Sequence, residues 1–428
     1  MTVTVEQSKL VLNAFSAIFQ NNLLAADLVT WKKYDSEMND RNGLTVVEQV
    51  PPRYNVTTTE NGIKDLTAGV QSTVFGSEMY NINRTFGSSM GWGDFVKIRD
   101  LGEARESEAI KAAATNLAEA IDAHILRFCA LASNNWLGTP GLAVDSFGDF
   151  MAGYTRLKEE GVEDTDLRAV LTYGDKQALG EEVIQMAAPD AMVTQSFRGG
   201  FTGEVGGIPT LFTQQLPTLI MGTRTNGAIN GAAQNVNYAD VARASAPGRY
   251  LSQVIAIDGI GGGTQTIKAG EVFTIAGVYA YDNRLGAQLD HLQQFTVLED
   301  AVAVAGAVAA LRIFPALVAP TGNDVNIAHA TVSAAPADNA VVTFMGTSGQ
   351  AVRPRLLMNK GAVVVNTADL IMPASGSASR KQLTKVPLSV RMWQDSTFET
   401  GEHRVRFDVA LTANVRDRRR LVRINGAA

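Results

Sequence analysis

The stretch from Asp100 to Asn134 alternates apolar and polar positions at helical spacing and contains no proline. Its apolar positions follow one another three, four or seven residues apart and so share one face of a helix: Ile110, Leu117, Ile121, His124, Phe128 and Leu131. Asp100 and Glu103 have the spacing of a capping box at the start. We expect a helix of roughly 45 Å at 1.5 Å per residue, either the spine of a flat subunit or the long helix of a bundle.

Two segments precede this helix. Residues 6–30 repeat apolar side chains at helical intervals, so this strongly apolar helix must pack against its own core or a neighbouring subunit. Residues 44–98 are rich in β-formers interrupted by Pro51-Pro52 and Asn61-Gly62, which predicts a long two-stranded excursion. Such a hairpin is marginal alone, so we expect it to contact a partner. The candidate contact residues in the two segments are Phe15, Ile18, Lys64, Val74 and Phe75.

The pattern changes twice after the long helix. Helical periods at 146–160 and 175–187 alternate with short strands at 169–173 and 208–212, which indicates a mixed α/β layer. From about residue 226 to 346 the chain is helix-poor, and five β-rich runs are separated by turn signals. This insertion is expected to form a small antiparallel barrel or sandwich. Its expected core residues are Phe273, Ile275, Val278, Phe295, Val297, Leu311 and Ile313.

Composition narrows the class of protein. Hydrophobic residues make up 46% of the 428 residues and charged residues 19%, so the chain is globular. The formal charge of −6 argues against nucleic-acid binding as the main activity, although it suits a surface that must not adhere to packed DNA. The longest run without charged or strongly polar residues, 301–311, is too short to span a bilayer, so no membrane is expected. Cys129 is the single cysteine and excludes an intramolecular disulfide.

Signals for an enzyme are weak. Gly87-Ser88-Ser89-Met90-Gly91 matches the G-x-S-x-G nucleophile pattern, but a further strand follows where a helix is required, so we interpret it as a loop or bulge. Residues 259–263 are glycine-rich without the lysine of a phosphate-binding loop. The four histidines never approach metal-ligand spacing. We therefore expect no catalytic residue, no metal site and no cofactor.

Arginines crowd the C-terminal segment RDRRRLVRI. The cluster could touch nucleic acid, but the acidic total charge favours pairing with carboxylates across a subunit boundary. Arg416, Arg418, Arg419 and Arg420 complete the candidate contact residues.

The order of these parts resembles the major capsid proteins of tailed bacteriophages with the HK97-like fold, in the branch typified by the coat protein of Salmonella phage P22. The resemblance rests on GEVFTIAGVYA at 270–280, LQQFTV at 292–297, VSAAPA at 332–337, KGAVVVNTADL at 360–370 through Pro373, and 405–424. One departure is Lys360, in a segment that often reads His-Lys-Asp-Ala-Phe in relatives.

The resemblance implies an α+β HK97-like capsid fold with an inserted small antiparallel β-barrel. It divides the chain into an N-arm (1–43), an extended loop (44–99), the spine helix of the peripheral domain (100–136), an axial domain in two parts (137–225 and 347–390), the inserted barrel (226–346), and peripheral strands with the C-terminal segment (391–428).

The function implied is structural. Copies would assemble, through a scaffolded precursor, into an icosahedral shell of hexamers and pentamers that encloses double-stranded DNA without sequence-specific binding.

The implied partners are a scaffolding protein and a portal protein, and the implied location is the virion capsid, assembled in the cytoplasm of the bacterial host. Two alternatives stay open from the residues alone: a cytosolic α/β serine hydrolase with a β insertion, and another phage structural protein such as a tail or portal component.

Overall fold

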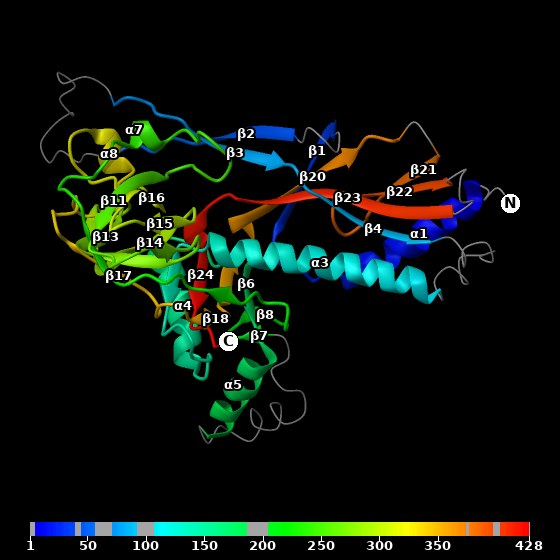
Figure 1. Ribbon diagram of the computed structural model, residues 1–428, viewed down its shortest axis with the longest axis horizontal. Helices are drawn as coiled ribbons and strands as arrows, with labels where there is room; N and C mark the ends of the chain where they lie inside the picture. The colour runs from blue at the N-terminus through cyan, green and yellow to red at the C-terminus, as the bar shows by residue number, and fades with distance from the viewer. Residues whose placement is uncertain are drawn as a thin grey trace, which may run out of the picture. The chain divides into compact units, whose positions relative to one another are not determined.

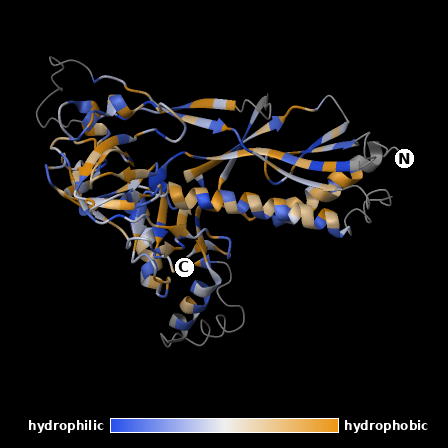
Figure 2. Cartoon of the chain, viewed as in Figure 1, coloured by the Kyte–Doolittle hydropathy of each residue, from blue (hydrophilic) through white to orange (hydrophobic). Residues whose placement is uncertain are grey.

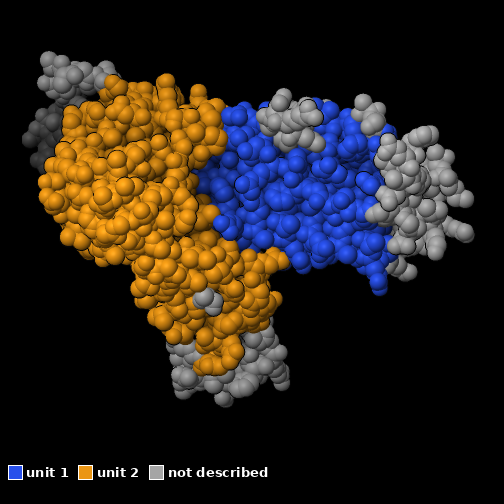
Figure 3. Space-filling view, viewed as in Figure 1, with its two compact units in different colours: residues 1–46, 80–128, 360–416 blue, residues 47–79, 129–359, 417–428 orange. Residues whose placement is uncertain are grey.

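The computed structural model describes residues 5–38, 44–55, 71–91, 107–185, 204–373, 376–396 and 403–427 (Figure 1). The chain divides into two compact units, coloured separately in Figure 3. Unit 1 comprises residues 1–46, 80–128 and 360–416, and unit 2 comprises residues 47–79, 129–359 and 417–428. Each unit is therefore built from segments that lie far apart in the sequence.

Unit 1 is organised around one mixed sheet and two helices. The sheet has the order β1-β20-β23-β22-β21, and β4 also pairs with β23. Only β1 and β20 run parallel among these pairs. The bounds are α1 Val5–Asn22, η1 Leu24–Ala26, β1 Thr30–Met38, β4 Thr85–Gly91, α3 Glu108–Ala132, η3 Lys360–Ala362, β20 Val363–Leu370, β21 Ser377–Gln382, β22 Ser389–Ser396 and β23 His403–Val415; α3 extends into unit 2 at its last turn.

The long predicted helix is present as α3, along which hydrophobic and hydrophilic residues alternate (Figure 2). Its fully buried side includes Ile110, Ile121 and Ile125. His124 and Phe128, which we placed on the apolar stripe, are only half-buried, so the buried face is rotated from the one predicted. The capping box at Asp100 and Glu103 lies outside the described residues.

The described parts of the 44–99 excursion do not form one simple hairpin. Strands β2 (Leu44–Val50) and β3 (Gly76–Ile82) pair with each other, as expected. Residues 71–75, within the β-rich region, have no regular structure, and the loop or bulge predicted at 87–91 is the strand β4. Glycine and serine are tolerated there because β4 completes its ladder on β23, from Ala410 opposite Thr85 to Arg404 opposite Gly91.

Unit 2 contains a second mixed sheet, with the order β5-β24-β19-β6-β8-β7. Helix α4 begins after Ser146, whose hydroxyl accepts a hydrogen bond from the Asp149 amide at 3.1 Å, as an N-cap does. The bounds are β5 Asn135–Leu137, α4 Phe147–Glu159, β6 Leu167–Leu171, α5 Tyr173–Gln185, β7 Glu204–Val205, β8 Ile208–Phe212, β19 Arg355–Asn359, η4 Arg418–Arg420 and β24 Leu421–Ile424.

The inserted segment of unit 2 is a closed six-stranded antiparallel barrel with the order β10-β11-β16-β14-β13-β17, which confirms the predicted barrel. The strands are β10 Gly227–Ile229, β11 Gln253–Asp258, β13 Val272–Asp282, β14 Ala287–Val297, β16 Val308–Phe314 and β17 Val341–Phe344. Short elements complete the unit: β9 Leu219–Ile220, α7 Tyr238–Val241, β12 Gln265–Ile267, β15 Ala301–Ala303, α8 Asp324–Ala328 and β18 Ala351–Val352.

The barrel encloses one apolar core. Period-2 alternation turns every second side chain of its strands inward, and the two phenylalanines Phe273 and Phe295 meet as a cross-strand pair with ring centroids 5.6 Å apart. The seven expected core residues all lie in this cluster: Phe273, Ile275, Val278, Phe295, Val297, Leu311 and Ile313.

The two ends of the barrel are neighbours, because Gly227 of β10 pairs with Val342 of β17. Excising residues 226–346 therefore leaves adjacent termini and need not strain the strands. We expect the isolated segment to fold cooperatively, with a single thermal transition by circular dichroism and dispersed amide resonances by NMR. A fragment without a cooperative transition would contradict this boundary.

Candidate functional site

The C-terminal arginines are held by a tight turn in unit 2. The Asp417 carboxylate accepts a hydrogen bond from the Arg419 amide at 3.1 Å and so caps the short helix η4. The same carboxylate binds the Arg419 guanidinium through Nε and Nη2, both at 3.1 Å, and lies 3.7 Å from Arg420 Nε. Arg419 and Arg420 thus have a carboxylate partner within the same chain, and the predicted contact across a subunit boundary stays a prediction.

Arg418 points to the interior of unit 2. It donates to the carbonyl oxygens of Ala132 at 3.2 Å and Gly248 at 3.4 Å, and its guanidinium lies 5.6 Å from the Phe314 ring centroid. Burial lowers the pKa of Arg418 to about 10, and the Glu78 carboxylate opposes that shift. The side chain therefore joins the end of α3 to the barrel segment around Gly248.

Arg423 is fully buried. It donates to the carbonyl oxygens of Gly270 at 2.7 Å and Ser133 at 3.2 Å, and its guanidinium lies 4.5 Å from the Trp136 ring centroid. Burial lowers the pKa of Arg423 to about 9. A cluster that looks like a surface charge run in the sequence is thus largely an internal scaffold.

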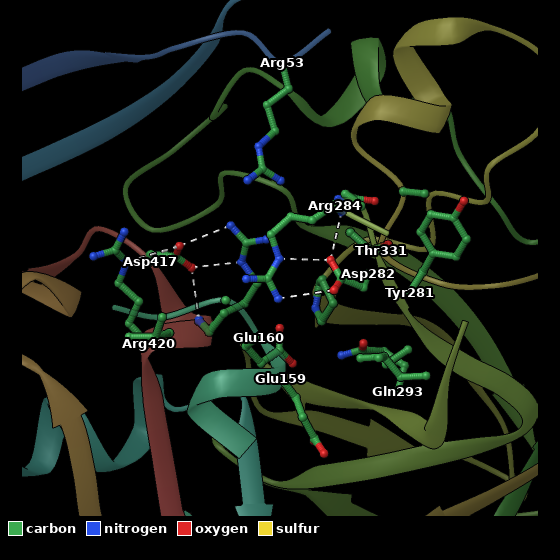
Figure 4. Close-up of a pocket in the computed structure, with 18 residues that line it drawn as sticks. Arg53, Glu159, Glu160, Tyr281, Asp282, Arg284, Gln293, Thr331, Asp417 and Arg420 are labelled. Carbon is green, nitrogen blue, oxygen red and sulfur yellow. Dashed lines mark hydrogen bonds and ion pairs between the residues drawn. The ribbon is translucent and has the colours of Figure 1, made fainter. Parts of the chain in front are cut away.

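A cavity of about 120 Å³ adjoins this turn within unit 2 (Figure 4). It is lined by the end of α4, the β13–β14 hairpin, the C-terminal turn and Arg53. Its charged lining residues are Arg53, Arg284, Arg419, Arg420, Glu159, Glu160, Asp282 and Asp417. Charges of both signs line it, but no nucleophile–base pair is among its residues.

Glu78 connects strand β3 to the barrel segment of unit 2. Its side chain is buried and accepts hydrogen bonds from the amides of Met79 and Gly248, both at 3.1 Å. Backbone bonds between Ser77 and the residues Ala242 and Ala244 join the same two segments. The first residues of β3 are therefore fixed within their own chain rather than lying free for a neighbour.

We expect the free energy of unfolding to depend on pH through this buried carboxyl group. Burial raises the pKa of Glu78 from 4.5 to about 7, so the folded chain binds a proton more tightly than the unfolded chain does. The stability from this group is fully present below pH 4.5 and is lost as the pH rises through 7. We expect a loss on the order of 3 kcal/mol over that window, measured by urea denaturation.

In the variant Glu78→Gln the side chain is neutral at every pH, so the free energy of unfolding should fall less between pH 4.5 and 7 than in the wild type. The exposed residue Glu163 provides the control, because Glu163→Gln should leave the slope unchanged. An equal slope in Glu78→Gln and the wild type would contradict the assignment.

The other candidate contact residues lie in different environments. Phe15 is fully buried in unit 1, stacked on Phe407 with ring centroids 3.9 Å apart, so it is a core residue of its own subunit. Ile18 is half-buried, and Val74 packs against an apolar cluster beside the barrel. Phe75 is 51% exposed, Arg416 is exposed, and Lys64 lies outside the described residues.

Residues considered for chemistry are not assembled into a site. Ser89 lies within β4, opposite Arg406. Within the described ranges no three His, Cys, Asp or Glu side chains gather as metal ligands. In the same part of the chain no helix has the length and apolar character of a bilayer span.

Several structural residues were missed by the sequence patterns. Asp122 does not belong to the predicted apolar face of the long helix, yet it is buried and accepts hydrogen bonds from the amides of Leu24 and Ala25, both at 2.9 Å. Burial raises the pKa of Asp122 to about 6. The sequence could not predict this burial, because the hydrogen-bond donors for Asp122 are the amides of η1, which lie about a hundred residues earlier in the chain.

The family model described as P22 coat protein, gene protein 5, matches residues 9–419. No match was found among curated proteins. Among solved structures, the chain is similar to the capsid of cyanophage P-SCSP1u, with 10% identity, a TM-score of 0.42 and coverage of 94% of this chain and 88% of that one. It is also similar to the mature capsid of bacteriophage PhiM1, with 9% identity, a TM-score of 0.42 and coverage of 93% and 85%.

Proposed function

This chain belongs to the P22 coat protein family and is the major capsid protein of a tailed phage, and from this we propose how its parts serve the shell. The match over residues 9–419 carries the identification and includes the closed barrel. Copies of the chain form an icosahedral shell, and the protein is structural rather than enzymatic. The hydrolase alternative is thereby set aside.

The proposed partners are those of shell assembly. Hexamers and pentamers of the chain would form with a scaffolding protein, include a portal protein at one position, and enclose double-stranded DNA without reading its sequence. The net charge of −6 supports this, because a negatively charged chain does not adhere strongly to phosphates. Many weak heterologous contacts can then close a shell in which no single contact is strong.

We propose that each segment of the sequence forms one structural part of the capsid subunit. Support comes from the barrel strands, which all lie between Gly227 and Phe344. The proposed parts are an N-arm (1–43), an extended loop (44–99), a spine helix (100–136), an axial domain (137–225 with 347–390), the inserted barrel (226–346) and the peripheral strands with the C-terminal segment (391–428).

We place a subunit contact on the extended loop. Three large apolar side chains of its described part are exposed: Val47 at 58%, Tyr54 at 55% and Phe75 at 51%. Large apolar residues that one segment exposes are candidates for an interaction surface. Arg416 is the remaining exposed candidate among the C-terminal arginines.

Sedimentation tests this contact. Phe75→Asp should leave the melting temperature of the free subunit unchanged and reduce the yield of fast-sedimenting shells. The exposed barrel residue Leu285 offers a matched control, since Leu285→Asp should fold and assemble normally. Normal shell yield from Phe75→Asp would remove Phe75 from the interface.

A further inference from the structure

Four arginines line the cavity in unit 2: Arg53, Arg284, Arg419 and Arg420 (Figure 4). Its volume of about 120 Å³ leaves room for several water molecules or a small anion. Gly161 forms part of the wall with φ of +80°, and an added Cβ there would lie 3.1 Å from Arg284 Cζ. A side chain at this position would crowd the Arg284 guanidinium, which glycine avoids.

Two aspartates hold two of the arginines by one edge. Asp282 accepts from Arg284 Nε at 3.1 Å and Nη2 at 3.2 Å, and Asp417 binds Arg419 through the same two nitrogens. In both arginines the carboxylate binds the side of the guanidinium that carries Nε and Nη2. Nη1 makes no hydrogen bond to a described residue. Each guanidinium is thus oriented while keeping donors for a further acceptor.

Arg53 adds a further guanidinium to a lining that also carries four carboxylates. Figure 4 shows its side chain extending toward the Arg284 and Asp417 groups. Its guanidinium has no ion pair with any described residue. Of the nearby carboxylates, Glu159 lies 3.4 Å from Arg156 Nε, whereas Glu160 accepts from Asn135 Nδ2 at 3.3 Å and also attracts the Arg419 guanidinium.

We propose that this cavity binds a small oxyanion of the phosphate class, with Arg53 and the Nη1 groups of Arg284 and Arg419 as donors. Planar guanidinium groups suit such an anion because they donate two parallel hydrogen bonds to its oxygens. The anion would link three segments of unit 2: the Arg53 segment, the β13–β14 hairpin and the C-terminal turn. It would therefore stabilise the folded subunit by mass action. Phosphate binding at this cavity would not depend on whether the chain forms a shell.

Inorganic phosphate is the probe. Thermal melting of the full-length free subunit should rise with sodium phosphate relative to sodium chloride at equal ionic strength and pH, and calorimetry should give a saturable isotherm. Arg53→Gln should weaken phosphate binding roughly ten- to a hundredfold, because one charged donor is lost. Arg53→Lys keeps the charge without the fork and should weaken it less.

Arg416→Gln is the matched control, since Arg416 is exposed and lies in unit 1. It should bind phosphate as the wild type does. The proposal is overturned if phosphate stabilises no more than chloride, or if Arg53→Gln and Arg416→Gln bind equally. Tighter Arg53-dependent binding of a short oligonucleotide or an acidic peptide would also overturn it, because the site would then serve a macromolecule.

Discussion

Phe273→Ala is expected to lower the free energy of unfolding of the barrel by about 3–5 kcal/mol. Phe273 is fully buried, and its ring centroid lies 5.6 Å from that of Phe295 and 5.3 Å from that of Phe344. It pairs with these residues on the two adjacent strands, so truncation opens a cavity at a point where three strands meet. A loss of this size is a large part of the stability of a small domain.

Urea denaturation followed by circular dichroism measures this effect. The control is Val341→Ala on strand β17, because Val341 is 53% exposed on the same barrel. It should change the stability little. Equal destabilisation by the two variants would show that the core does not hold the barrel together.

Asp175→Ala is expected to cost about 3–5 kcal/mol by leaving a buried charge without a partner. Arg355 is 3% exposed and Asp175 is fully buried. Their contact is bidentate, at 2.7 Å from Nε and 2.9 Å from Nη2. Asp175 also accepts hydrogen bonds from the amides of Thr172 at 2.9 Å and Val144 at 3.2 Å, which would lose their acceptor.

A double variant distinguishes the lost charge pair from lost packing. Asp175→Leu combined with Arg355→Met replaces the pair with apolar side chains and should recover part of the stability in urea denaturation. Asp164→Ala serves as the surface control, because Asp164 pairs with Lys158 in an exposed position. It should produce no measurable change. A stable Asp175→Ala protein would refute the expected role of the pair.

The barrel could be predicted because its strands follow a local rule. Phe273, Ile275, Phe295 and Val297 alternate with outward residues, and this period is visible in the sequence. The closing strand β10 was missed, because Gly227–Ile229 is only three residues long and begins with glycine. Its partners β11 and β17 define it, and they lie far along the chain.

The candidate site could not be predicted for a related reason. Arg423 contacts carbonyl groups of Gly270 and Ser133, more than a hundred residues away in the sequence. The sequence near Arg423 shows only a run of arginines, and such a charge run usually lies on a solvated surface. The cavity has the same character, since Arg53, Arg284 and Asp417 meet only after the chain has folded.

The central claim is that copies of this chain build a closed shell. Electron cryomicroscopy of the protein co-expressed with its scaffolding protein tests it most directly. We predict closed particles of uniform size with icosahedral symmetry, in whose reconstruction each subunit fits the two units and the six-stranded barrel. A preparation that remains monomeric, or that forms only open tubes or tail-like rods, would contradict the account.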